Sequence, residues 1–235
     1  MWTEEGWHLV LPIKGGSRAK SRLQVEPPVR VQLAHALAQD CLAAVTQAEL
    51  ASVVVVTSDP WMSAAAAASG VGVVPDPGRG PNAAARAGLG VAPARLARAV
   101  LLADLPALTV DALLVGLRAA AAHDRAFVPD RQGLGTVLLT ARARMPLRPT
   151  FGPASAAAHA ADGVTRLELD LPRLRTDVDT AEDLAVAVAL GVGVHTAALL
   201  PQLAPALTTT WSPAPPSAPN PAEGYAAQPS AGHAS

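Results

Sequence analysis

Aromatic residues are scarce in this sequence, because Phe, Trp and Tyr make up only 3% of its 235 residues. Alanine, valine and leucine must therefore pack the core, which favours layers of helices and strands over an aromatic-rich all-β fold. Half of the residues are hydrophobic, which is enough for a sizeable core. The length predicts one domain of about 200 residues and a tail.

The sequence also lacks a large net charge, and it has few cysteines. The formal net charge is −1, so no overall field attracts nucleic acid or a membrane surface, and an anionic ligand needs a local cationic site. The single cysteine, Cys41, has no partner for an intrachain disulfide, which fits a reducing cytosol. Its helical surroundings indicate a small core residue rather than a nucleophile.

No apolar run reaches the roughly 20 residues that a membrane span needs without glycine, proline or charge. The segment 184–200 comes closest, but it contains His195 and follows an acidic helix start. The first residues, MWTEEGWH, carry acids where a signal peptide has basic residues. We therefore expect a cytoplasmic protein with no membrane or nucleic-acid partner.

Short apolar runs alternate with alanine-rich helical patterns along the first 190 residues. The runs predict strands at 8–13, 52–57, 71–74, 99–103, 126–129, 136–140 and 164–171. The helical patterns cover 29–48, 60–69, 82–97, 109–122 and 180–190. Continuous apolar strands are typical of a parallel sheet that is buried on both faces. The sum is a three-layer α/β domain.

The composition changes at about Pro201, after which Pro, Ala and Ser dominate without periodicity. Such a segment buries too little apolar surface to offset its ordering entropy. We therefore predict one folded domain over 1–200 and a disordered tail over 201–235. A chain cut after Leu200 should then remain active.

The loop that follows the first strand, LPIKGGSRAKSRL at 11–23, concentrates positive charge on glycine-rich backbone. Gly15 and Gly16 allow backbone N–H groups to turn toward a ligand, and the cations are Lys14, Arg18, Lys20 and Arg22. This combination suits a nucleotide polyphosphate. The alternative is a solvated basic turn, since the loop is neither a Walker A motif nor a GxGxxG fingerprint.

Carboxylates occur where a cation could be held. Asp104 directly follows a predicted strand, and Thr109 is a better candidate than Asp104 for capping the next helix. Asp177 and Asp179 would point to the same side of an extended segment, where they would repel unless a cation lay between them. Oxygen ligands favour Mg²⁺ or Mn²⁺, and no Cys/His cluster indicates zinc. Asp183 is expected to serve the N-terminus of the helix that Thr180 caps.

Two segments rich in small residues could bind a phosphate or a carboxylate. The segment GLGTVLL contributes Thr136, and FGPAS contributes Gly152 and Ser155. Taken singly, both are ordinary turns. His159 could face the same site, although a histidine packed within a helix is the simpler interpretation.

Six segments, in this order, resemble the guanylyltransferases that make the precursor of the deazaflavin coenzyme F(420), within the nucleotidyltransferase-A-like superfamily. They are LPIKGGSRAKSRL, PNAAARAG, ADLPAL, FVPDRQGLGTVLL, FGPAS with the later histidine, and DVDTAEDL. The resemblance spans residues 8 to about 190. It identifies the domain over 1–200 as a nucleotidyltransferase domain, and it implies a Rossmann-like nucleotide-diphospho-sugar transferase fold with a mostly parallel, mixed sheet.

The resemblance also implies roles for individual residues. The resemblance implies two Mg²⁺ ions, and their ligands would be Asp104, Asp177 and Asp179. The acceptor would be bound by Thr136, Gly152 and Ser155. GTP would be bound by Lys14, Gly15, Gly16, Arg18, Lys20 and Asn82, with Lys20 and Asp104 acting in catalysis. The family reads GLN where this chain has GPN, and Pro81 removes a backbone donor from any contact with the base.

The implied reaction is attack of an acceptor phosphate on the α-phosphorus of GTP, with pyrophosphate leaving. The resemblance implies phosphoenolpyruvate as the acceptor, with 2-phospho-L-lactate as the alternative. A homodimer is left open as the assembly state. A molybdenum-cofactor guanylyl- or cytidylyltransferase would keep the fold, but its opening loop usually reads LAGGxSxRMGxxK. A non-catalytic nucleotide-binding scaffold is the alternative of another class.

Overall fold

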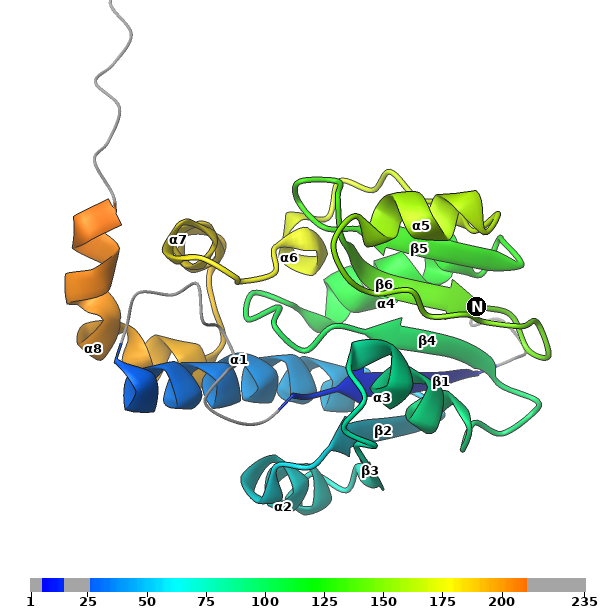
Figure 1. Cartoon of the computed structure of the whole chain (residues 1–235), viewed down its shortest axis with the longest axis horizontal. Coiled ribbons are helices and arrows are strands. Elements are labelled where there is room, and N and C mark those ends of the chain that lie inside the picture. The colour runs from blue at the N-terminus through cyan, green and yellow to red at the C-terminus, as the bar shows by residue number, and fades with distance from the viewer. Residues whose placement is uncertain (1–5, 15–25, 211–235) are drawn as a thin grey trace, which may run out of the picture.

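Seven strands form one mixed sheet in the computed structural model, which describes residues 6–14 and 26–210 (Figure 1). The strand order across the sheet is β3-β2-β1-β4-β6-β5-β7. The strand bounds are β1 Trp7–Pro12, β2 Ser52–Thr57, β3 Gly72–Pro75, β4 Ala97–Leu101, β5 Arg125–Pro129, β6 Thr136–Ala141 and β7 Thr165–Arg166. Six of these strands lie within two residues of the predicted bounds.

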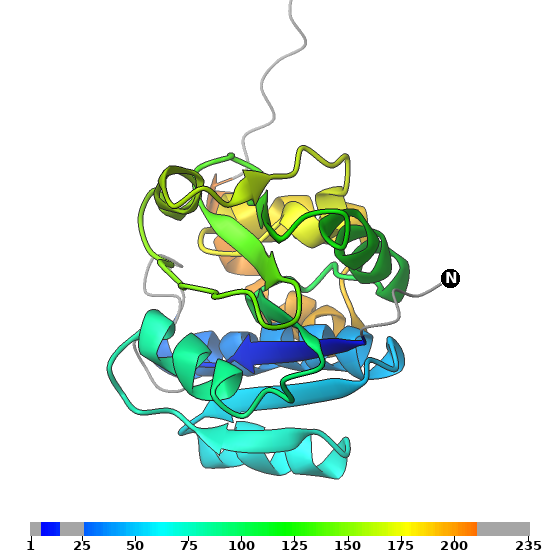
Figure 2. The ribbon, with the colours of Figure 1, turned by 90° about the vertical axis from the view of Figure 1, so that its right-hand side faces the viewer.

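The sheet is mostly parallel, as predicted. β1 pairs in parallel with β2 and with β4, and β2 pairs in parallel with β3. β6 is the exception, because it runs antiparallel to both β4 and β5 (Figure 2). Chain order reverses between β1 and β4, and in open α/β sheets ligands bind at the carboxyl ends of the strands beside such a switch point.

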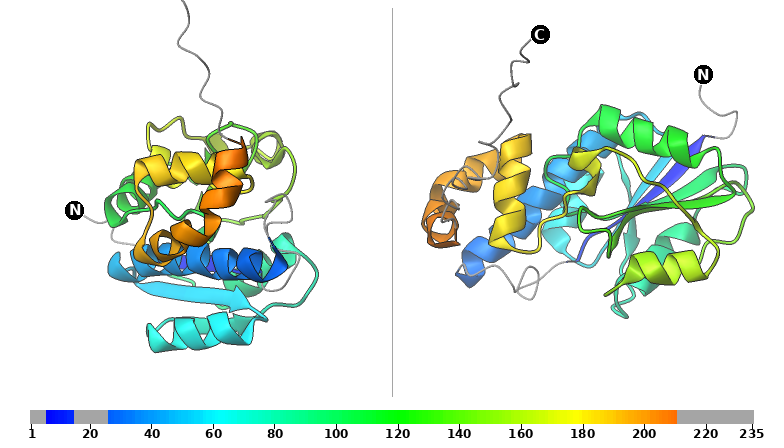
Figure 3. Two further views of the ribbon diagram at one scale, coloured as in Figure 1. Left: turned by 90° about the vertical axis from the view of Figure 1, so that its left-hand side faces the viewer. Right: turned by 90° about the horizontal axis from the view of Figure 1, so that it is seen from above.

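Helices cover both faces of the sheet, which confirms the three-layer architecture (Figure 3). Helices α1, α2 and α4 pack on one face, and α3 and α5 pack on the other. The helix bounds are α1 Pro27–Gln47, α2 Pro60–Ala68, α3 Pro81–Leu89, α4 Val110–Ala120, α5 Ser155–Ala161, α6 Pro172–Arg175, α7 Ala181–Leu190 and α8 Val194–Thr210. Within residues 6–14 and 26–210, no helix is both long and apolar enough to cross a membrane.

The core explains why the strands read as continuous apolar runs. Leu9 and Leu11 of β1 pack with α1 on one face, whereas Val10 packs with α3 on the other. Successive side chains of a strand point to opposite faces, so both sets must be apolar when both faces are covered. Cys41 is fully buried in the α1 side of this core, as expected of a packing residue.

The predicted helix caps are present. The Thr180 side chain accepts a hydrogen bond from the Asp183 N–H, and the Asp183 carboxylate accepts one from the Thr180 N–H, which completes a capping box. Thr109 caps α4 by accepting from the Ala112 N–H. These short-range contacts are readable from sequence because both partners lie within one helical turn.

Two predicted elements are shorter than expected. Helix α3 ends at Leu89 instead of continuing to residue 97, because Gly90 and Pro93 terminate the pattern. The strand predicted over 164–171 is reduced to Thr165–Arg166, and residues 167–171 lead into α6 without forming a strand. Neither change affects the residues proposed for the site.

Helix α8 continues to Thr210, past the domain boundary predicted at residue 201. The Asp40 carboxylate on α1 accepts hydrogen bonds from the backbone N–H groups of His195 and Thr196, both at 2.9 Å. The start of α8 is thus fixed by a residue more than 150 positions away, and Pro201 within the helix disguises its pattern. The tail predicted for 211–235 lies outside the described residues and stays a prediction.

A chain cut after Leu200 is therefore expected to lose stability. Leu203 is fully buried in a cluster with Leu33, Leu37 and Val178, and burial of one such leucine is worth about 2–5 kcal/mol. Val178 separates Asp177 from Asp179, so a looser cluster should also disturb these carboxylates. Denaturant unfolding should show a clear loss after a cut at residue 200 and wild-type stability after a cut at residue 210. Equal stability of the two truncated chains would contradict a structural role for α8.

Candidate active site

A pocket of about 540 Å³ opens at the carboxyl ends of β1, β2, β3 and β4, beside the switch point of the sheet. Most of its lining residues are apolar, and among the described residues its charged lining side chains are Lys14, Asp76, Asp104 and Asp179. Gly78, Gly80 and Pro81 form the wall between β3 and α3. An apolar cleft suits the flat base of a nucleotide. The basic side chain suits the anionic end of such a ligand, and the acidic side chains suit a cation that is bound with it.

Gly80 and Pro81, which line the pocket at the start of α3, depend on backbone geometry. Gly80 has φ +86° at the N-cap of α3, a conformation that favours glycine. Pro81 occupies the first position of α3, where the missing N–H costs the helix nothing. The departure from the family's GLN therefore leaves the helix start intact, and the lost donor affects only a ligand.

Lys14 is exposed at the rim of the pocket, immediately after β1. The other residues predicted to bind GTP phosphates, Gly15, Gly16, Arg18 and Lys20, lie outside the described residues. Their placement is untested, and so is the catalytic role predicted for Lys20.

A backbone hydrogen bond joins the two acidic segments. The Val178 N–H donates to the Asp104 carbonyl oxygen at 3.0 Å, which sets the segment 177–179 against the end of β4. Val178 points into the core, whereas Asp177 and Asp179 are half-buried on the other side, as the period of two predicts. Residues more than 70 positions apart thus meet at one edge of the pocket.

The carboxylates at this edge repel one another. Burial, together with the charges of Asp104, Asp130 and Asp179, raises the pKa of Asp177 to about 7. Among the residues that the structure describes, no three His, Cys, Asp or Glu side chains already form a group that could hold a metal ion. The predicted ligands therefore lie close enough for their charges to interact, but they do not yet form a coordination site for a metal ion.

Asn82 makes protein contacts rather than presenting its amide to the pocket. Its side chain donates to the Phe151 carbonyl oxygen at 2.9 Å and accepts from the Phe151 N–H at 2.6 Å. Phe151 itself lines the pocket. Asn82 thus ties the start of α3 to the FGPAS segment, and its contact with the nucleoside stays a prediction.

The residues predicted to bind the acceptor lie on two adjacent segments. Thr136 begins β6 and is 1% exposed, while Ser155 begins α5 and is 2% exposed. Gly152 has φ +148°, and its carbonyl oxygen accepts from the Ser155 N–H at 3.1 Å. The Ala156 N–H donates to the Leu134 carbonyl oxygen at 3.0 Å, which joins the two segments.

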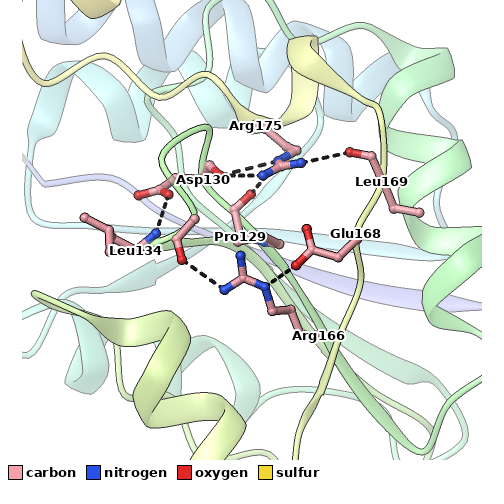
Figure 4. A network of polar contacts seen from close by, with 8 residues as sticks. Pro129, Asp130, Leu134, Arg166, Glu168, Leu169 and Arg175 are labelled. Atoms are coloured by element: carbon pink, nitrogen blue, oxygen red, sulfur yellow. Dashed lines mark hydrogen bonds and ion pairs between the residues drawn. The ribbon is translucent and has the colours of Figure 1, made fainter.

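The turn before Thr136 is held by a polar network (Figure 4). The Asp130 carboxylate accepts from the backbone N–H group of Leu134 at 2.9 Å, as Figure 4 shows. It also accepts from the Gly135 N–H at 2.7 Å. The Arg175 guanidinium donates to the Asp130 carbonyl oxygen at 3.0 Å and to the Leu169 carbonyl oxygen at 3.1 Å. Arg166 donates to the Gly133 carbonyl oxygen at 2.9 Å. The turn is thereby fastened to the segment that leads to Asp177.

Comparison with known proteins gives the same family by sequence. The MobA-like NTP transferase domain family matches residues 29–167, which is more than half of the chain. Phosphoenolpyruvate guanylyltransferase of Thermomonospora curvata is 45% identical over 214 residues, covering 87% of this chain and 94% of its own. The enzyme of the same name from Streptomyces coelicolor is 46% identical over 207 residues, covering 84% and 97%. The chain belongs to the phosphoenolpyruvate guanylyltransferase family.

Solved structures share the fold of this family member at low sequence identity. A protein described as a nucleotide-diphospho-sugar transferase, from Desulfovibrio desulfuricans G20, superposes with a TM-score of 0.60 at 16% identity and covers 86% of this chain and 97% of its own. A protein of Mycobacterium tuberculosis solved in complex with manganese gives a TM-score of 0.52 at 21% identity and covers 80% and 100%. The nucleotide-diphospho-sugar transferase fold implied by the resemblance is confirmed, and this family member is a nucleotidyltransferase.

Sequence reasoning missed Asp130 and Arg175 in this guanylyltransferase family member. Asp130 directly follows β5, as Asp104 follows β4, so its position after an apolar run was a usable signal. Arg175 gave no such signal, because its hydrogen-bond partners are backbone carbonyl oxygens at Pro129, Asp130 and Leu169. Asp183, predicted to serve its own helix, does so and also accepts from Arg131 at 3.0 Å.

Proposed function

We propose that this protein transfers GMP from GTP to phosphoenolpyruvate, giving enolpyruvoyl-2-diphospho-5′-guanosine and pyrophosphate, as a step of coenzyme F(420) biosynthesis. The observation that carries the proposal is the 45% identity to phosphoenolpyruvate guanylyltransferases over nearly the whole of both chains. The pocket at the switch point, which is lined by Lys14 and by the carboxylates of Asp104 and Asp179, supports it. A cytoplasmic location and a homodimer stay predictions.

The chemistry follows from charge. The phosphate of the acceptor has a second pKa near 6 and is mostly deprotonated at pH 7, so attack on the α-phosphorus needs no general base. Two unit charges about 4 Å apart repel by about 4 kcal/mol at an effective dielectric constant of 20. Several such pairs meet when the acceptor approaches GTP. The protein must therefore offset repulsion and hold the two reactants in line.

Lys14 is proposed to meet the triphosphate at the rim of the pocket, together with the cations of the loop that follows it. Asp104, Asp177 and Asp179 would hold a divalent cation, because a set of oxygen donors suits Mg²⁺ or Mn²⁺. The raised pKa of Asp177 fits this role, since a cation would relieve the repulsion that raises it. When bound, the cation supplies positive charge against the phosphate oxygens. The manganese complex of the M. tuberculosis protein supports divalent metal use.

Thr136, Gly152 and Ser155 are proposed to bind the acceptor. They lie at the start of β6, in the FGPAS turn and at the start of α5, where hydroxyls and a glycine can receive an anion without steric bulk. Phe151, which precedes Gly152, also lines the nucleotide pocket. The acceptor would thus approach the triphosphate from the β6 side of the switch point.

Pyrophosphate release is the test. Full-length protein with Mg²⁺ should release pyrophosphate from GTP and phosphoenolpyruvate and form the diphosphate-linked product, detected by mass spectrometry. The same assay with 2-phospho-L-lactate, and with ATP or CTP, measures the choice of each substrate. Faster turnover of phospholactate would change the acceptor, and a preference for CTP would support the molybdenum-cofactor-type alternative. No release with any pair would favour a non-catalytic nucleotide-binding protein.

A further inference from the structure

His159 is fully buried on α5, although it carries two polar ring atoms. Its imidazole lies between two phenylalanine rings, with centroids 5.8 Å from Phe127 and 5.5 Å from Phe151. An apolar side chain could fill this space. A buried imidazole is retained at low cost only where both ring nitrogens find partners.

Both nitrogens of His159 have partners, on two different segments. The Thr150 backbone N–H donates to Nε2 at 3.1 Å, and Nδ1 lies 2.9 Å from the Thr136 hydroxyl oxygen. A backbone N–H can only donate, so Nε2 must carry a lone pair. In the neutral ring the proton is then on Nδ1, which donates to the hydroxyl oxygen of Thr136.

The surroundings favour this neutral form. Burial lowers the pKa of His159, and the one charge that opposes this effect is Asp162 at the end of the same helix. The Asp162 carboxylate is itself paired with the Arg125 guanidinium at 2.6 Å. A proton on Nε2 would face the Thr150 N–H and break that hydrogen bond.

The two segments joined by His159 carry the acceptor residues proposed above. Thr136 follows the turn that Arg175 and Asp130 fasten in Figure 4, so the start of β6 is a fixed point. Thr150 lies two residues before Gly152, and Phe151 between them is held by Asn82 from the opposite side. His159 thus sets the distance between the start of β6 and the FGPAS turn, while Asn82 ties that turn to the nucleotide pocket.

We propose that His159 is a positioning residue that fixes the acceptor side of the active site by joining Thr136 to the loop Thr150–Gly152. The inference rests on the proposed function, and it concerns the residue's effect on one of the two substrates. Among the hydrogen bonds and ring contacts that His159 makes with the described residues, only the ring contact with Phe151 involves a residue that lines the nucleotide pocket. Its loss should therefore weaken acceptor binding and leave GTP binding nearly unchanged.

The test is the steady-state kinetics of His159→Phe, which keeps an aromatic ring but removes both hydrogen bonds. The KM for phosphoenolpyruvate should rise about 10- to 100-fold, as expected when a buried N–H loses its partner. The KM for GTP should stay within about twofold. Amide hydrogen exchange in residues 150–155 should become faster, since the loop loses its tie to α5. Thr136→Val, which removes the other partner, should raise the same KM.

Two further variants make the test decisive. His159→Gln retains an acceptor near the position of Nε2, should restore part of the affinity, and replaces His159→Phe if that variant does not fold. His123→Phe, a matched change of a half-buried histidine beyond the end of α4, should leave both KM values at the wild-type level.

The outcomes separate this inference from the proposed function. A wild-type protein that turns over no acceptor overturns the proposed function, and this assignment with it. An active wild-type protein whose His159 variants shift the KM of GTP and of the acceptor equally, or shift neither, overturns the inference alone. Unchanged hydrogen exchange at residues 150–155 would also contradict it.

Discussion

Replacing Asp104 by asparagine is expected to lower turnover by about 1,000-fold or more while the protein stays folded. The proposed cation offsets several kcal/mol of repulsion between phosphates, and each 1.4 kcal/mol corresponds to a factor of ten in rate. Asparagine keeps the size of the side chain and the backbone hydrogen bond from Val178, which involves the carbonyl oxygen of residue 104. Charge is therefore the main property removed.

The measurement is pyrophosphate release at saturating GTP and phosphoenolpyruvate, over a range of Mg²⁺ concentrations. Asp124→Asn is the matched control, because it makes the same change at a side chain that is 70% exposed beyond the end of α4. The control should retain wild-type turnover, and circular dichroism should show the same fold for both variants. A rate near that of wild type for Asp104→Asn would remove Asp104 from the proposed metal site.

Replacing Asp177 by asparagine is expected to abolish turnover and yet to stabilise the metal-free protein at pH 8. The pKa of Asp177 is about 7 in the folded protein and 3.8 as its ordinary value. Between pH 3.8 and about 7 the folded protein keeps this proton, whereas the unfolded chain has released it. The free energy of unfolding therefore falls as the pH rises over this interval. Above pH 7 the ionised group costs on the order of 2–4 kcal/mol, which asparagine would remove.

Denaturant unfolding at pH 5.5 and pH 8 with a chelator measures this effect. The difference in free energy of unfolding between Asp177→Asn and wild type should be larger at pH 8. Adding Mg²⁺ should raise the melting temperature of wild type more at pH 8 than at pH 5.5, because protons compete with the cation, and should do little for the variant. Lower stability of Asp177→Asn at pH 8 would show that the carboxylate is not under repulsion.

Both predictions concern carboxylates, at Asp104 and Asp177, that are far apart in the sequence. That they lie near each other could be inferred only from the fold class. The sequence identified Asp104 as a residue that ends a buried strand, and it placed Asp177 and Asp179 on one side of an extended segment. The parallel sheet brings the carboxyl ends of its strands to one edge, which explains why such reasoning finds a site. It did not assign a role to Asp130, although the charge of this residue contributes to the raised pKa of Asp177.

Helix α8 shows where sequence patterns fail. Its first turn is held by Asp40 of α1, and its Leu203 packs against Leu33 of the same helix. Proline within a segment argues against a helix on local grounds. Burial against α1 and α7 decides otherwise, because packing of an apolar face supplies most of the stability of helices in proteins.

The sequence by itself determined six of the seven strands, most helices, the capping box of α7 and the family, since each depends on neighbours in the chain or on motifs in a fixed order. The tertiary structure alone decided which polar groups face one another. It paired Asn82 with the Phe151 backbone and His159 with Thr136 and Thr150, and it raised the pKa of Asp177. Hydrogen bonds and pKa values depend on distances of a few ångströms between residues remote in sequence, and only the folded chain sets those distances.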